Sequence, residues 1–112
     1  ADSLRQLLLN LLINAIEAAT DATGKAGVVR VELSSGPPST PTRLRVLDSG
    51  PGPNPAMATR LFEPFATSKP DGTGLGLSVA QEIADAHSAR LAWHREGELT
   101  CFEVVFALSQ QS

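Results

Sequence analysis

The N-terminal residues have the hydrophobic spacing of a helix. Apolar residues recur at steps of three and four along one side, at Leu4, Leu7, Leu8, Leu11, Leu12 and Ala15. Further apolar residues cover the far side, at Leu9, Ile13 and Ile16. This pattern predicts a helix over residues 4–19 that is buried on two faces.

A narrow polar stripe divides those two apolar faces. Asn10, Asn14, Glu17 and Asp21 follow one another at steps of four, three and four, which return to the same side of a helix. Taken singly, Asn10 and Asn14 are more simply interpreted as ordinary helix-surface residues. Two amides that face one way on an otherwise apolar helix make a functional role more plausible than this, because such a polar stripe needs a partner.

Two strands and a sharp turn follow the helix. Alternating apolar residues at 29–33 and an apolar run at 44–48 predict strands, joined by a loop rich in proline, serine and threonine. After Asp48 the residues Ser-Gly-Pro-Gly-Pro cannot continue a strand, because proline lacks an amide donor and glycine favours irregular backbone. We therefore expect the chain to turn at residues 49–53.

The second half of the chain predicts two helices and a closing hairpin. Asn54 and Pro55 are typical of a helix start, so we expect a short helix that ends before Pro64. Apolar residues recur at helical spacing from Leu77 to His87. Residues 91–95 and the alternating positions from 100 to 108 predict a closing hairpin. This order of elements predicts an α+β fold, a two-layer α/β sandwich with helices on one face of a sheet.

Length and composition limit what the domain can be. At 112 residues and 42% apolar content, the chain fits a single domain over residues 1–112, which we expect to be a fragment of a longer protein. A net charge of −3 without a cluster of basic residues argues against nucleic acid as a partner. The longest apolar stretch, residues 7–16, is interrupted by two asparagines and is shorter than the roughly 18 residues a membrane span needs.

The single cysteine carries little functional signal. Cys101 has no second cysteine with which to form an internal disulfide, so we expect a buried thiol in a strand and a cytoplasmic setting. We expect no membrane contact by this domain, although the full-length protein could be anchored in a membrane. His87 and His94 are both interpreted as structural residues.

The glycine-rich stretch DGTGLGLS, residues 71–78, is a candidate phosphate site. Glycines allow close approach of the backbone to an anion, and the following helix presents unpaired amides. A flexible hinge before a core helix is an equally good interpretation of this stretch alone. The motif is neither a dinucleotide-binding fingerprint nor a P-loop, because no strand precedes it and no Lys-Ser/Thr pair follows its last glycine.

Three other side chains suit the binding of a nucleotide. Asp48 can accept a hydrogen bond from the amine of adenine and would reject the carbonyl of guanine, although it could simply cap the turn. The amide oxygen of Asn14 suits one position around Mg²⁺, which favours few protein ligands. Lys69 could reach the terminal phosphate, or could be a solvated loop lysine.

Four motifs in this order resemble the catalytic ATP-binding domain of sensor histidine kinases, in the GHKL superfamily with the Bergerat fold. NLLINA (residues 10–15) resembles the N box, and DSGPG (48–52) the G1 box. FEPF (62–65) resembles the F box, and GTGLGL (72–77) the G2 box. The short segment between the last two motifs is similar to that of the nitrogen-regulation and oxygen-sensing kinases. The resemblance implies a mixed sheet with helices on one face and an ATP lid.

The resemblance also implies roles for individual residues. Asn14 would bind Mg²⁺, Asp48 would recognise adenine, and Gly50 and Gly52 would make room for the base. The residues implied for phosphate and lid contacts are Phe65, Lys69, Gly72, Thr73, Gly74, Leu75 and Gly76. The catalytic candidates are Asn10, which would line the same pocket, and Lys69, which would contact the phosphate.

The implied activity is transfer of the γ-phosphate of ATP to a histidine on a separate dimerisation hairpin, with a response regulator downstream. Neither His87 nor His94 stands in such a hairpin, so we expect no autophosphorylation by this chain alone. Many members of the family place a basic residue where this chain has Glu17, which would leave charge neutralisation to Mg²⁺ and Lys69. The alternatives are an ATP hydrolase, which would need a glutamate at Asn10, an anti-sigma serine kinase, and a nucleotide-gated interaction module.

Overall fold

The described part of the chain has helices and strands in the order that the hydrophobic pattern predicts. The computed structural model describes residues 2–20, 27–35, 41–53, 62 and 76–106. Its elements are α1 (Asp2–Ala19), β1 (Val29–Ser34), β2 (Arg43–Asp48), α2 (Gly76–Ala86), β3 (Ala89–Glu96) and β4 (Leu99–Phe106). The short helix predicted after Asn54 lies outside the described residues. None of the described helices is long and apolar enough to cross a membrane.

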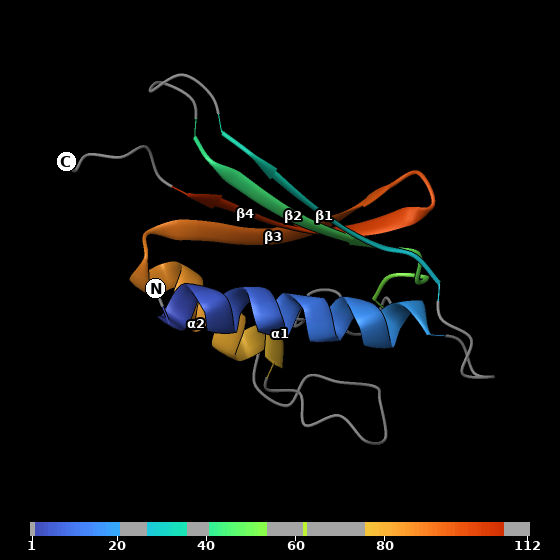
Figure 1. Ribbon diagram of the computed structural model, residues 1–112, viewed down its shortest axis with the longest axis horizontal. Coiled ribbons are helices and arrows are strands. Elements are labelled where there is room, and N and C mark those ends of the chain that lie inside the picture. Colours follow the sequence, from blue (N-terminus) through green and yellow to red (C-terminus); the bar gives the residue numbers. More distant parts are fainter. Residues whose placement is uncertain (1, 21–26, 36–40, 54–61, 63–75, 107–112) are drawn as a thin grey trace.

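The four described strands form one sheet with the order β1-β2-β4-β3 (Figure 1). All three pairings are antiparallel, so the prediction of a mixed sheet is wrong for the described strands. The reason is the position of β4 in the strand order. These two strands run in the same direction, but β4 lies between them and pairs with each in the opposite direction. The predicted α+β sandwich is confirmed.

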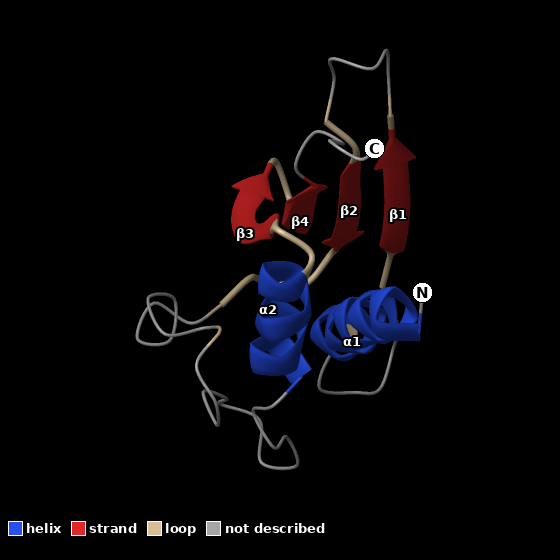
Figure 2. Cartoon of the chain, turned by 90° about the vertical axis from the view of Figure 1, so that its left-hand side faces the viewer, coloured by secondary structure: helices blue, strands red, loops and turns tan. Residues whose placement is uncertain are grey.

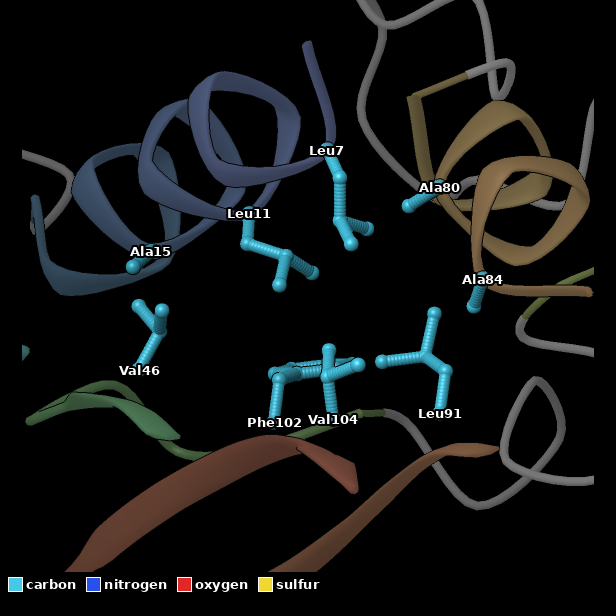
Figure 3. Close-up of a cluster of buried hydrophobic side chains, with 9 residues drawn as sticks. All are labelled: Leu7, Leu11, Ala15, Val46, Ala80, Ala84, Leu91, Phe102 and Val104. Carbon is cyan, nitrogen blue, oxygen red and sulfur yellow. The ribbon is translucent and has the colours of Figure 1, made fainter. Parts of the chain in front are cut away.

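Both helices lie on the same face of the sheet (Figures 1 and 2). Helix α1 packs on β2 and α2 packs on β3, while the two helices also contact each other. Alanines at three of the core positions let the helices approach closely, because small side chains leave little between two backbones. The buried core contains Leu7, Leu11, Ala15, Val46, Ala80, Ala84, Leu91, Phe102 and Val104 (Figure 3).

The prediction that α1 is buried on two faces is wrong. Leu9, Ile13 and Ile16 keep 49%, 46% and 54% of their surface exposed. Helix α1 buries only the side that faces the sheet and α2, where Leu7 and Leu11 are almost fully enclosed. Periodicity identified the helix correctly, but it could not show that only one layer covers it.

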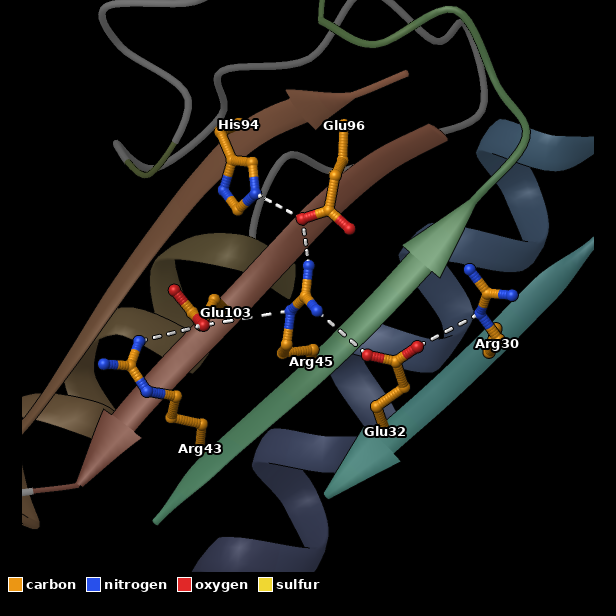
Figure 4. Close-up of polar contacts among 7 residues, drawn as sticks. All are labelled: Arg30, Glu32, Arg43, Arg45, His94, Glu96 and Glu103. Carbon is orange, nitrogen blue, oxygen red and sulfur yellow. Dashed lines mark hydrogen bonds and ion pairs between the residues drawn. The ribbon is translucent and has the colours of Figure 1, made fainter. Parts of the chain in front are cut away.

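The other face of the sheet carries a network of ion pairs (Figure 4). Arg45 on β2 pairs with Glu32 on β1, with Glu103 on β4 and with Glu96 on β3, so it links all four strands. Cys101 is fully buried on this face, as predicted, and burial raises the pKa of its thiol. This face is therefore closed by charged side chains, whereas helices close the opposite one.

Candidate nucleotide site at the end of β2

Asp48 ends β2 at the edge of the apolar core. Val46 and Leu47 precede it, and all three residues are fully buried. Its Oδ1 accepts a hydrogen bond from the backbone amide of Gly50 at 2.8 Å. Asp48 thus caps the turn, as one of the two interpretations predicted. The same geometry holds a carboxylate in place where the core ends.

Gly50 lets the turn after β2 pass close to the end of α1. A Cβ at Gly50 would lie 2.4 Å from the carbonyl oxygen of Ala18 and 2.8 Å from the Oδ1 of Asp48. Only glycine fits between these atoms. The structure thus gives a packing reason for this glycine, and its implied role toward a base stays a prediction.

Gly52 completes the turn against the closing hairpin. Its φ of +86° lies in the left-handed region that side chains disfavour. A Cβ there would lie 3.2 Å from both the Cδ of Arg95 and the Oγ1 of Thr100. The turn is therefore packed between α1 on one side and β3 and β4 on the other.

Helix α1 supplies one wall of the candidate site. The Nδ2 of Asn10 donates to the carbonyl oxygen of Gly76 at 3.3 Å, which joins the first helix to the start of α2. Two turns later Ala18 faces Gly50. Asn14 lies halfway between these contacts, four residues from each, and is half-buried. The structure thus places Asn10 against Gly76 and places Gly50, which is hydrogen-bonded to Asp48, against the end of α1.

The N-terminus of α2 supplies the second wall. Helix α2 begins at Gly76, the last glycine of the G2-like motif, where a Cβ would meet nothing within 4 Å. The first amides of a helix lack intrahelical partners and carry partial positive charge, which favours an anion. The remaining residues predicted for this wall and the lid, Phe65, Lys69, Gly72, Thr73, Gly74 and Leu75, lie outside the described residues.

Phe62 is the described residue of the F-like motif. It is half-buried, and its ring meets that of Phe102 edge to face, with centroids 6.2 Å apart and an interplanar angle of 90°. This geometry is favourable for aromatic pairs. The contact anchors the start of the motif on the core.

Sequence reasoning missed two polar residues of the site. Thr100 lies opposite Asp48 in the pairing of β2 with β4 and is 1% exposed. The sequence pattern could have identified Thr100, because this residue is the first inward-facing position of the alternation that continues to Phe102. Ser49 accepts a hydrogen bond from the amide of Val28 at 2.9 Å and so fixes the turn to the start of β1. No periodicity identifies such a turn contact.

The two histidines lie apart from these residues. His87 follows α2, and its Nε2 lies 2.9 Å from the Oγ of Ser3. His94 pairs with Glu96 on the outer face of the sheet (Figure 4). Within the described ranges, no group of three or more His, Cys, Asp or Glu side chains could hold a metal ion.

The arrangement offers two different chemical environments at two points along α1, one beside Ala18 and one beside Asn10. A buried carboxylate and a threonine hydroxyl stand at the end of β2, where they suit a hydrogen-bond donor such as an amine. Across the α1 wall, the start of α2 suits an anion. A ligand with an amine at one end and phosphates at the other would match both environments.

Comparison with known proteins identifies the family of this chain. Residues 1–110 match the family described as "Histidine kinase-, DNA gyrase B-, and HSP90-like ATPase". The sensor protein kinase PilS of Pseudomonas aeruginosa is 38% identical over 105 residues, covering 93% of this chain and 20% of PilS. The C4-dicarboxylate transport sensor protein DctB of Rhizobium meliloti is 42% identical over 88 residues, covering 79% of this chain and 14% of DctB. The chain thus spans a fifth or less of these relatives.

Solved structures give the same result. The nucleotide-free catalytic domain of the histidine kinase ThkA superposes with a TM-score of 0.79 at 30% identity, covering 96% of this chain and 67% of that one. Full-length ShkA in complex with AMPPNP gives a TM-score of 0.70 at 31% identity, covering 96% of this chain and 22% of that one. The chain belongs to the histidine kinase-, DNA gyrase B- and HSP90-like ATPase family, as a catalytic ATPase domain of the sensor histidine kinase type.

Proposed function

We propose that this domain binds Mg-ATP and transfers its γ-phosphate to a histidine on a separate dimerisation hairpin. One observation carries the proposal. Helix α1 connects the two other segments at separate points: near its end Ala18 packs against Gly50, in the turn that Asp48 caps, and two turns earlier Asn10 donates to Gly76 at the start of α2. The similarity to ShkA, solved with AMPPNP, supports a nucleotide as the ligand.

The base would be recognised by the buried carboxylate. An ionised Asp48 only accepts hydrogen bonds, so it suits the exocyclic amine of adenine and disfavours the carbonyl that guanine presents at the same place. A buried polar group left unpaired is costly, which makes this type of discrimination strong. Gly50 and Gly52 would border the base.

The phosphates would lie toward the start of α2. Gly72, Thr73, Gly74, Leu75 and Gly76 would supply backbone contacts, while Lys69 and Phe65 would belong to a lid that closes over the nucleotide. The half-buried amide of Asn14 fits one Mg²⁺ position, because a hard cation takes neutral oxygen ligands and shares the rest with phosphate and water. Bound Mg²⁺ would offset phosphate charge.

The chemical step is a phosphoryl transfer. A ring nitrogen of the acceptor histidine attacks the γ-phosphorus, a P–N bond forms, the bond from phosphorus to the β–γ bridging oxygen breaks, and ADP leaves. The domain contributes position and charge stabilisation. Asn10 would position the start of α2 through its bond to Gly76, and an amide cannot act as the base that water attack would need. This favours transfer to histidine over hydrolysis.

The acceptor and the later partner would come from outside this chain. The histidine would be on a dimerisation hairpin of the same protein, and a response regulator would take the phosphoryl group next. The proposed setting is cytoplasmic, with neither nucleic acid nor membrane as a partner of this domain.

The test combines binding with single turnover. Calorimetry would measure Mg-ATP binding, with GTP as the competitor, for the wild-type domain, for Asp48→Asn and for the control Asp85→Asn, a carboxylate on the exposed side of α2. Labelled ATP would then be mixed with the domain and a histidine hairpin taken from a relative.

We expect ATP to bind and GTP not to bind, with affinity lost in Asp48→Asn, kept in Asp85→Asn and weakened without Mg²⁺. Label should appear on the hairpin in an acid-labile form. Binding without transfer to any hairpin would favour the nucleotide-gated module. Absence of ATP binding by the folded domain would overturn the proposal.

A further inference from the structure

Arg95 joins the turn after β2 to the closing hairpin. It lies near the end of β3, and its Nη1 donates to the carbonyl oxygen of Gly50 at 2.7 Å and to the Oγ1 of Thr100 at 2.6 Å. Both hydrogen bonds are partly buried. A charged donor makes them stronger than neutral hydrogen bonds of the same length.

The sheet register explains why this arginine reaches the turn. Asp48 pairs with Thr100 across β2 and β4, and Thr100 pairs with Arg95 across β4 and β3. Residues that pair directly point to the same face of a sheet. Asp48, Thr100 and Arg95 therefore form one row of side chains across three strands, on the face that carries the helices.

Asp48 and Arg95 bind the two peptide groups on either side of Gly50. The amide of Gly50 donates to Asp48, and the carbonyl of the same residue accepts from Arg95. The aliphatic part of Arg95 also lies where a side chain at Gly52 would be. The arginine thus contacts the turn at two points and leaves it little freedom to move away from β4.

We propose that Arg95 is a positioning residue for the nucleotide site, which fixes the turn of residues 49–52 and thereby sets the carboxylate of Asp48 for base recognition. The inference rests on the proposed function for its binding consequences. It also has a consequence in the free domain. Without Arg95, the amides of the turn should open to solvent more often, because the shorter of the two hydrogen bonds to the Gly50 carbonyl is gone and the one from Thr100, at 3.4 Å, remains.

A second way for Arg95 to act would be attraction of the phosphates by its charge. The two modes differ in which ligands they affect. A positioning effect weakens adenosine, ADP and ATP by a similar factor, because it acts at the base. A charge effect weakens ATP most and leaves adenosine unchanged, because only the phosphates carry charge.

The experiment uses Arg95→Gln, Arg95→Lys and the matched control Arg90→Gln, which removes the same charge from the other end of the same strand. Calorimetry or ligand-detected NMR would give the dissociation constants for adenosine, ADP and ATP. Amide hydrogen exchange of the free domain would be followed at residues 49, 50 and 52.

For Arg95→Gln we expect each ligand to bind about tenfold more weakly, the size of one lost charge-assisted hydrogen-bond group. Exchange at the turn should rise, and both effects should be smaller in Arg95→Lys, whose ammonium can still donate to the two oxygens. Arg90→Gln should match the wild type in all readouts.

Three outcomes would overturn the inference: weakening of ATP alone, unchanged exchange at the turn, or a loss in Arg90→Gln as large as in Arg95→Gln. Failure of the proposed function is distinguishable from these. In that case the wild-type domain itself binds no nucleotide, and the exchange measurement on the free domain still tests whether Arg95 anchors the turn.

Discussion

The two faces of the sheet are stabilised in different ways. The face under α1 and α2 is apolar from Leu91 and Val104 to Val46, and it becomes polar only at its end, where Asp48 and Thr100 are buried. The outer face is charged over most of its length and is organised around Arg45 (Figure 4). The candidate site thus lies where a rigid apolar core stops.

This difference has a physical consequence. Burial of apolar side chains contributes most of the free energy of folding, whereas partly exposed ion pairs contribute little each. Positions on the helix side should therefore control stability, and positions at its polar end should control binding. The ion pairs on the outer face should affect both only weakly.

The largest effect is expected in the core. Leu11→Ala should lower the free energy of unfolding by about 2–5 kcal/mol, because a fully buried leucine leaves a cavity. The matched control is Leu9→Ala on the same helix, at a position that is 49% exposed, where the change should stay within about 0.5 kcal/mol. Urea denaturation measures both. Equal losses would contradict the one-sided burial of α1.

The next effect is expected at the turn. Gly50→Ala should lower stability by about 1–3 kcal/mol, because its Cβ would overlap the carbonyl of Ala18 and force the turn away from α1. Gly76→Ala is the control for stability, since a Cβ there meets nothing within 4 Å. Thermal unfolding would compare them. A wild-type melting temperature for Gly50→Ala would show that the turn does not pack as described.

A smaller effect is expected on the outer face. Arg45→Met should cost about 1–2 kcal/mol, because it removes the cation shared by Glu32, Glu96 and Glu103. Arg30→Met is the control, because its pair with Glu32 is more exposed and should contribute less than about 0.5 kcal/mol. Nucleotide affinity should stay unchanged in both. A loss of affinity in Arg45→Met would break the separation between the two faces.

The smallest effect is a pH dependence at the edge of the same network. The hydrogen bond from His94, aided by Arg45, lowers the pKa of Glu96 below its ordinary value of 4.5. A carboxyl with a lowered pKa in the folded state stabilises the fold above its unfolded pKa, and this contribution disappears as the pH falls through the folded value. The stability difference between wild type and Glu96→Gln should therefore be constant near neutral pH and shrink below about pH 4.5.

Denaturation curves recorded from about pH 6 to about pH 3 would measure this difference. Glu98→Gln in the adjacent turn controls for the loss of one negative charge from the hairpin. A difference that grows toward acid pH would contradict the assigned direction of the pKa shift.

The sequence allowed most of the fold to be predicted, because each described element has a strong local pattern. The alternation from Thr100 and the helical spacing after Gly76 predicted β4 and α2 correctly. Exposure of Ile13 and the antiparallel pairing of β2 with β4 could not be predicted in this way. Both depend on which elements are neighbours in space, and local periodicity contains no such information.

The candidate site was predictable where chemistry and position coincide in a motif. The sequence indicates Asp48 because a carboxylate stands at the end of an apolar strand and is followed by glycines. It indicates Asn10 and Asn14 because they are polar on an otherwise apolar helix. Thr100 and Arg95 belong to no such motif. They are placed by the strand register, which pairs Thr100 with Asp48, far away in the sequence, and Arg95 with Thr100.

The most direct test of the account is a map of where ATP binds. Backbone amide NMR spectra of the domain, recorded with and without Mg-ATP, would report on every described element. We predict shifts at the second half of α1, at residues 48–52, at the start of α2 and at Thr100, with none on the outer face at Glu32, Arg43 or Glu103. Shifts centred on the outer face, or none at saturating ATP, would contradict the assignment of the nucleotide site to the polar end of the helix-covered face.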